Sequence, residues 1–252
     1  MNKIVLITGA TSGFGKAIAQ KFAAAHYNCI ITGRRKEKLL EVANELNQRF
    51  GVAILQLVFD VQDKKAVFEA IESLPEEWKA IDVLINNAGL ALGRDSFQDA
   101  SLDDWETMID TNVKGLMYVS KAVVPLMTAR KQGHIINLGS IAGKEAYKNG
   151  NMYCATKAAV DMLSKTMRID LLPFHIKVTA IHPGAADTEF SMVRFKGDAE
   201  KAKQTYNGYT PLHAEDIAGI AFYCSELPPH VCINELVVTC TAQANATVFY
   251  QV

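Results

Sequence analysis

The sequence predicts a doubly wound α/β domain in which helices cover both faces of a parallel, seven-stranded sheet. Short β-branched and apolar runs alternate with segments of helical periodicity along the chain, an order that favours a parallel sheet. Runs such as IVLIT at residues 4–8 are continuously apolar, as in strands buried on both faces. No linker rich in Gly, Pro or Ser divides the 252 residues, so we expect one domain over residues 1–252.

The predicted elements follow one another in strict alternation. Strands are expected where apolar residues are continuous, at residues 4–8, 29–32, 53–59, 83–86, 134–138, 178–181 and 236–239. Helices are expected where apolar residues recur at helical spacing, at residues 16–25, 38–50, 64–74, 105–130, 153–172 and 216–225. The one long interruption, at about residues 184–209, is expected to be the substrate loop, because long loops in compact domains are usually functional.

Composition excludes several classes of function. A formal net charge of −1 with 21% charged residues offers no electrostatic attraction to nucleic acid or to an anionic membrane. We find no apolar run near the 20 or so residues of a membrane span, and no signal-peptide pattern. Five cysteines without a CxxC pair indicate reduced thiols and a cytoplasmic protein. The histidines have no metal-ligand spacing, so no metal site is expected.

A glycine-rich turn, TGATSGFG at residues 8–15, lies between the first strand and the first helix. Gly9 can form the sharp turn, Gly13 lets the backbone approach a pyrophosphate, and Gly15 allows close packing of helix and strand. The helix N-terminus then faces the anion. Because the turn directly follows a strand and opens a helix, it predicts a Rossmann-type dinucleotide site, with Thr11, Ser12 and Phe14 as further contacts.

The end of the second strand indicates which dinucleotide binds. NAD-binding units usually place Asp or Glu there, to bind the ribose hydroxyls. This chain has Gly33, Arg34 and Arg35 instead, and Glu37 already belongs to the next helix. Guanidinium groups can bind a 2′-phosphate through charge-assisted hydrogen bonds. The sequence therefore predicts NADP(H).

The order of five motifs resembles the short-chain dehydrogenase/reductase family over nearly the whole chain. The motifs are TGxxxGxG at residues 8–15, NNAG at residues 86–89, Asn112, Ser140, and Tyr153-x-x-x-Lys157. The YxxxK pair alone is weak evidence, since such pairs arise by chance. In this combination, with Ser140 thirteen residues before Tyr153, the set is specific.

The chemistry of three residues supports that resemblance. Tyr153 and Lys157 are four apart on a predicted helix and so project from one face. An ammonium beside a phenol is expected to lower the tyrosine pKa, so that Tyr153 can donate a proton to an alkoxide or accept one from an alcohol. Ser140 follows the fifth strand, and α/β proteins bind ligands at the carboxyl ends of their strands.

Further roles are implied by the resemblance alone. It implies that Asn112 holds a water in a proton relay and that Lys157 contacts the nicotinamide ribose. It also implies a homotetramer, with a partner contacting the helices around Asn112 and Tyr153 and possible exchange of the tail 242–252. His182 is interpreted as structural, because the family's mechanism uses no histidine. The further cofactor contacts that it implies are Asp60, Val61, Asn87, Ala88, Gly89, Pro183, Gly184 and Thr188.

The segments at residues 187–198 and 210–218 resemble the NADP-dependent 3-hydroxy acid dehydrogenases, which act on serine-like hydroxy acids and malonic semialdehyde. In the loop, Arg194 and Lys196 are the basic residues of the apolar part, and Arg194 lies between Val193 and Phe195. We expect Arg194 to bind a substrate carboxylate, with the reacting oxygen between Ser140 and Tyr153. A general carbonyl or 3-oxoacyl reductase is the alternative, and a non-catalytic NADP(H) sensor a third.

Overall fold

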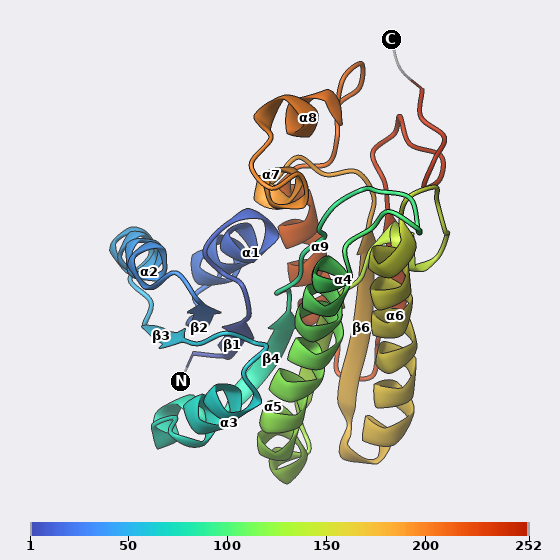
Figure 1. Cartoon of the computed structure of the whole chain (residues 1–252). Helices are drawn as coiled ribbons and strands as arrows, with labels where there is room; N and C mark the ends of the chain where they lie inside the picture. Colours follow the sequence, from blue (N-terminus) through green and yellow to red (C-terminus); the bar gives the residue numbers. More distant parts are fainter. Residues whose placement is uncertain (1, 251–252) are drawn as a thin grey trace.

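A computed structural model describes residues 2–250, with side chains omitted at residues 202–204. Its seven parallel strands run in the order β3-β2-β1-β4-β5-β6-β7 (Figure 1). The strands are β1 Ile4–Ile7, β2 Asn28–Gly33, β3 Ile54–Val58, β4 Ile81–Asn86, β5 Gly133–Leu138, β6 Ile176–Pro183 and β7 Glu235–Val238. The predicted sheet is therefore confirmed.

Helices cover both faces of this sheet because alternate side chains of the strands point to opposite faces. From β1, Val5 and Ile7 join one buried cluster with α1, α2 and α9, whereas Ile4 and Leu6 join the other with α3, α5 and α6 (Figure 1). The bounds are α1 Gly13–Ala24, α2 Lys36–Phe50, α3 Lys64–Glu72, α5 Leu116–Arg130, α6 Asn151–Leu171 and α9 Ala214–Glu226. Within residues 2–250, no helix combines the length and apolarity needed to cross a bilayer.

The carboxyl ends of the strands carry the loops that form the candidate site. The chain moves outward from β1 in one direction and from β4 in the other, and α/β sheets bind ligands in the crevice at such a switch point. The loop after β6 contains two short helices, α7 Glu189–Arg194 and α8 Ala199–Gln204, which lie over this edge (Figure 1). After β7 the chain forms a small hairpin, in which Gln243 bridges to Phe249.

The helix expected over residues 105–130 is confirmed, since the chain is helical without a break over 102–130, but it is not α-helical throughout. The structure has α4 Leu102–Ile109, a π-helical turn Asp110–Gly115, and then α5. A π turn holds one more residue than an α turn and is frequent at functional sites. Gly115 lies against Val61, where a Cβ would approach the valine side chain to 2.7 Å. Asn112 lies within this π turn, inside a helix that continues on both sides of it.

Candidate active site

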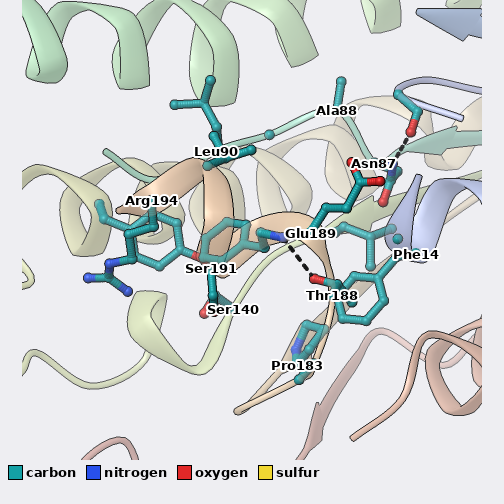
Figure 2. A pocket seen from close by; sticks show the side chains of 18 of the residues that line it. Phe14, Asn87, Ala88, Leu90, Ser140, Pro183, Thr188, Glu189, Ser191 and Arg194 are labelled. Atoms are coloured by element: carbon teal, nitrogen blue, oxygen red, sulfur yellow. Dashed lines mark hydrogen bonds between the residues drawn. The ribbon is translucent and has the colours of Figure 1, made fainter. Parts of the chain in front are cut away.

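One cavity of about 570 Å³ extends along the carboxyl ends of the strands and collects nearly all of the predicted site residues. Figure 2 shows Arg194 and Ser140 at one end and Phe14 and Thr188 at the other. Two predicted residues, Gly15 and Asn112, do not line it. Those that do are Gly9, Thr11, Ser12, Gly13, Phe14, Arg34, Arg35, Asp60, Val61, Asn87, Ala88, Gly89, Ser140, Tyr153, Lys157, Pro183, Gly184, Thr188 and Arg194.

The glycine turn has the geometry that the sequence predicts. Gly9 and Gly13 have φ angles of +67° and +51°, in the left-handed region that favours glycine. A Cβ at Gly15 would lie 2.3 Å from the carbonyl oxygen of Gly9 and 2.5 Å from Nδ2 of Asn87. Gly15 therefore does not line the cavity itself. Its lack of a side chain allows the first turn of α1 to pack directly against the glycine-rich turn.

Thr8 joins this turn to the loop after β4. Its hydroxyl accepts hydrogen bonds from the backbone amides of Asn87 at 3.0 Å and Ala88 at 2.9 Å. The Asn87 side chain donates in return to the carbonyl oxygens of Thr8 and Gly9. These bonds bridge the two strands at the switch point, so the opening between them is held at a fixed width.

Two arginines close the end of the cavity beside β2. Arg35 donates to the hydroxyls of Thr11 at 2.7 Å and Ser12 at 3.1 Å, and Arg34 pairs with Asp60 at 3.1 Å. A Cβ at Gly33 would come within 2.9 Å of the Thr11 methyl group, so this corner is narrow. Two guanidinium groups beside two hydroxyls fit a 2′-phosphorylated ribose better than a free ribose diol.

Ser140, Tyr153 and Lys157 converge from two elements. Ser140 precedes a 3₁₀ turn after β5, and its hydroxyl accepts a hydrogen bond from the Ala142 amide at 3.1 Å. Tyr153 and Lys157 are buried on α6. Lys157 Nζ donates to the carbonyl oxygen of Leu138 at 2.8 Å and lies 6.0 Å from the centroid of the Tyr153 ring.

The pKa values at this site differ from the simple expectation. Burial raises the pKa of Tyr153 above its ordinary value, while Ser140 and Arg194 oppose that shift. Burial also lowers the pKa of Lys157 to about 8. The expected lowering of the tyrosine pKa by Lys157 is therefore wrong for this arrangement, because desolvation is the larger effect on both groups.

Asn112 supports the site from the π turn. Its Nδ2 donates to the carbonyl oxygen of Leu90 at 2.8 Å and to the Thr156 hydroxyl at 3.1 Å, and its Oδ1 accepts from the Leu90 amide at 2.8 Å. A Cβ at Gly89 would lie 3.1 Å from that Oδ1 and 3.4 Å from Lys157 Nζ. Asn112 thus ties the loop after β4 to α6, next to the lysine.

Arg194 is the last residue of α7, and its side chain lies at the end of the cavity that contains Tyr153. Its Nη2 donates to the Tyr147 hydroxyl at 3.1 Å, and its guanidinium carbon lies 5.5 Å from the centroid of the Tyr153 ring. Its neighbour Val193 is 45% exposed, and the rings of Tyr147 and Tyr153 pack on the arginine instead. Lys196 pairs with Asp104 at 2.8 Å, so it is not available as a second anchor.

A family model described as short chain dehydrogenase matches residues 3–199. The chain belongs to the short-chain dehydrogenase family. The order of motifs in the sequence and the seven-stranded parallel sheet agree with this assignment.

Known relatives and solved structures agree with this family assignment. This short-chain dehydrogenase is 48% identical to sulfoacetaldehyde reductase 2 from Chromohalobacter salexigens, over 97% of its own chain and 96% of that protein. It is also 48% identical to an NADP-dependent 3-hydroxy acid dehydrogenase from Escherichia coli (strain K12), over 96% and 97%. The closed form of a serine dehydrogenase complexed with NADP+ superposes with a TM-score of 0.92, at 48% identity, over 98% of this chain and 99% of that one.

Several residues in the cavity wall of this short-chain dehydrogenase belong to no motif in the sequence. Tyr147 lies in the turn before α6, and Phe190 on α7 packs its ring 5.6 Å from that of Tyr153. Gln243 is buried, and its Oε1 accepts from the Ala185 amide at 2.8 Å. Phe249 packs against Tyr209 with ring centroids 5.0 Å apart and the ring planes tilted by 35°. Only the fold brings these residues together, since the last two lie after the final strand.

A charged cluster lies behind Ser140. The Asp161 carboxylate of α6 binds the ammonium groups of Lys144 and Lys165 at 2.8 and 2.9 Å. His182 of β6 is fully buried with Nε2 3.5 Å from Asp161, and Glu235 of β7 also binds Lys144. Asp161, His182 and Glu235 could together hold a metal ion, but two lysines already neutralise the carboxylates. The cluster joins the turn after Ser140 to the helix of Tyr153.

Proposed function

We propose that this enzyme uses NADP(H) to interconvert a short 3-hydroxy acid and its semialdehyde or keto acid. The observation that carries the proposal is the position of Arg194, 5.5 Å from the centroid of the Tyr153 ring and bonded to Tyr147. A fixed cation this close to the proton-transferring tyrosine suits a substrate whose acid group is a short carbon chain from the reacting oxygen.

NADP(H), when bound, exchanges the hydride with the substrate carbon. In the proposed complex, the turn containing Gly9 and Gly13 receives the pyrophosphate at the N-terminus of α1. Arg34 and Arg35 bind the 2′-phosphate, and Thr188, whose side chain lies 3.4 Å from a Cβ built on Gly13, reaches the nicotinamide end. The remaining contacts that the family resemblance implies line the same cavity.

The chain's own residues move the proton. In the reductive direction, the Tyr153 hydroxyl donates its proton to the oxygen of the nascent alkoxide, and in oxidation the tyrosine oxygen takes the proton from the alcohol. The Ser140 hydroxyl donates a hydrogen bond to the same substrate oxygen. Lys157, with its pKa near 8, is suited to return the proton to the tyrosine near neutral pH. Asn112 borders Lys157 and is the proposed holder of a relay water.

The relatives' named substrates have one feature in common. Sulfoacetaldehyde, serine and other 3-hydroxy acids each carry an acid group near the carbon that reacts. The Arg194 guanidinium, oriented by the Tyr147 hydroxyl, can donate two parallel hydrogen bonds to a carboxylate or a sulfonate. We therefore assign the acid group to Arg194 and the reacting oxygen to the space between Ser140 and Tyr153.

A substrate comparison separates this function from the alternatives. Wild-type enzyme should turn over 3-hydroxypropionate with a much higher kcat/KM than its methyl ester. In Arg194→Met the acid should lose about 10²-fold in kcat/KM while the ester is little changed. A wild type without preference for the acid would instead be a general carbonyl or 3-oxoacyl reductase. Absence of turnover on all substrates, with NADPH still bound, would indicate a sensor.

We also propose a cytoplasmic homotetramer. Supporting the assembly, large apolar side chains are exposed on α5, on α6 and in the 3₁₀ turn after α6: Met117, Met162, Ile169 and Leu172 are 43%, 58%, 72% and 71% exposed. Such surfaces mark contacts between subunits. Light scattering of wild type and of Ile169→Asp would test this, because a charge in the contact should dissociate the assembly. The cytoplasmic location is supported by free cysteines throughout the described residues.

A further inference from the structure

We propose that Arg94 and Arg194 together form a two-cation site that accepts a doubly charged acid group, such as a phosphonate, at the substrate position. The inference rests on the proposed function, since it concerns the same acid group. It adds a second residue, Arg94, and a class of substrate, the dianionic phosphonates. A single arginine would neutralise only one of the two charges of such a group.

Both arginines surround Tyr147. The guanidinium carbon of Arg94 lies 6.0 Å from the centroid of the Tyr147 ring, and that of Arg194 lies 5.8 Å from the same centroid. Both residues line the cavity that contains Tyr153 and Ser140. Both guanidinium groups therefore lie around the Tyr147 ring at this end of the cavity, with Arg94 exposed, and in the proposed complex one acid group beside the Tyr147 hydroxyl binds both.

The backbone fixes Arg94 beside Arg194. Gly93 donates its amide to the carbonyl oxygen of Arg194 at 3.0 Å and accepts from the Arg194 Nε at 3.4 Å. Its φ of +67° is a conformation that other residues rarely adopt. On the other side, Asn151 at the start of α6 donates to the carbonyl oxygen of Asp95 at 3.1 Å. Arg94 thus lies on a short segment held between α7 and α6.

Among the described side chains, neither arginine at this end of the cavity is paired with a carboxylate, although Asp95 and Asp104 lie beside Gly93. By contrast, Arg34, Arg35 and Lys196 all make salt bridges. Packing on the Tyr147 ring offsets part of the repulsion between the two guanidinium groups. An anion between them would remove the rest, and a dianion would do so more completely than a monoanion.

A series of three alcohols tests the proposal: 3-hydroxypropionate, 2-hydroxyethylsulfonate and 2-hydroxyethylphosphonate. They share the HO–CH₂–CH₂ unit and differ only in the acid group, which carries one, one and two charges above the second phosphonate pKa. We would measure kcat/KM with NADP+ at pH 8.5, and for any member that is not oxidised its inhibition constant against 3-hydroxypropionate.

In wild type, the phosphonate should bind at least as well as the carboxylate at pH 8.5, and relatively less well at pH 6, where it loses one charge. Arg94→Gln should lower the phosphonate-to-carboxylate ratio by about tenfold, because the dianion loses more attraction than the monoanion when one of the two cations is removed. Arg94→Lys should retain part of the ratio. Lys148→Gln, which removes an exposed positive charge two residues before Gly150, is the control for long-range electrostatics and should leave the ratio unchanged.

Two results would overturn the proposal. An unchanged ratio in Arg94→Gln would show that Arg94 does not contact the acid group, and an equal decrease in Lys148→Gln would show that only the general field matters. Failure of the proposed function is separate, because it would appear as a wild type that does not distinguish 3-hydroxypropionate from its methyl ester.

Discussion

Replacing Gly15 by alanine should destabilise the protein, although the same replacement usually stabilises a helix. The added Cβ would lie 2.3 Å from the Gly9 carbonyl oxygen and 2.5 Å from Asn87 Nδ2, well inside van der Waals contact. Because the closest atom is backbone, we take the upper part of the overpacking range, about 3 kcal/mol. The higher helix propensity of alanine offsets at most about 1 kcal/mol of this loss. The net loss is about 2 kcal/mol, or roughly 4–8 °C in Tm for a chain of this size.

Thermal unfolding of Gly15→Ala and Gly219→Ala at equal protein concentration would check this value. Gly219 lies inside α9, and a Cβ there would meet nothing within 4 Å, so Gly219→Ala should gain about 0.5–1 kcal/mol. Gly15→Ala should also bind NADPH more weakly in a fluorescence titration, because the atom that must move belongs to the phosphate-binding turn. If Gly15→Ala were as stable as wild type and bound NADPH normally, the close approach of α1 to the turn would be refuted.

Three other changes have definite outcomes. Tyr153→Phe should bind NADPH normally but lose about 10²-fold or more in turnover; activity within a few-fold of wild type would contradict the proton-transfer role. Alanine at both Arg34 and Arg35 should weaken NADPH by about tenfold or more and leave NADH nearly unaffected, whereas equal weakening would mean that the arginines are structural. Because burial lowers the Lys157 pKa from 10.5 to about 8, the unfolded chain binds more protons between those pH values. The unfolding free energy of the cofactor-free enzyme should therefore rise with pH across that window relative to Lys157→Met, by about 3 kcal/mol in total. If the unfolding free energies of the two proteins changed in parallel with pH, the lowered pKa of Lys157 would be excluded.

Most of the fold follows from local sequence patterns. The five inner strands are largely buried on both faces, so their apolar runs are continuous and easy to locate, and the glycine turn fixes where the first helix begins. The exception is residues 110–115, where a π turn replaces the α-helical pattern inside the expected helix. Helical periodicity cannot reveal it, because the apolar residues on either side still recur at helical spacing. The cause is tertiary: Asn112 bonds to Leu90 and Thr156 on two other elements.

The site was predictable to different degrees at its two ends. The cofactor end and the catalytic residues lie in short contiguous motifs, and their positions in the cavity agree with the prediction. The substrate end is assembled from segments far apart in the chain: Arg94 after β4, Tyr147 before α6, Arg194 on α7 and Phe249 near the chain's end. No local pattern links them. The pKa of Tyr153 was also misjudged, since burial depends on packing that the sequence alone does not specify.

The hairpin after β7 has a practical consequence for handling the enzyme. Its strands are joined by the Ala244–Val248 and Tyr250–Ala242 backbone hydrogen bonds, and Gln243, Ala246 and Phe249 form part of the cavity wall. An affinity tag fused behind this hairpin would therefore sit close to the entrance for substrate and could alter KM by itself. The amino terminus precedes β1 and lies at the amino ends of the strands, opposite to the cavity (Figure 1). A tag placed there therefore leaves the entrance clear.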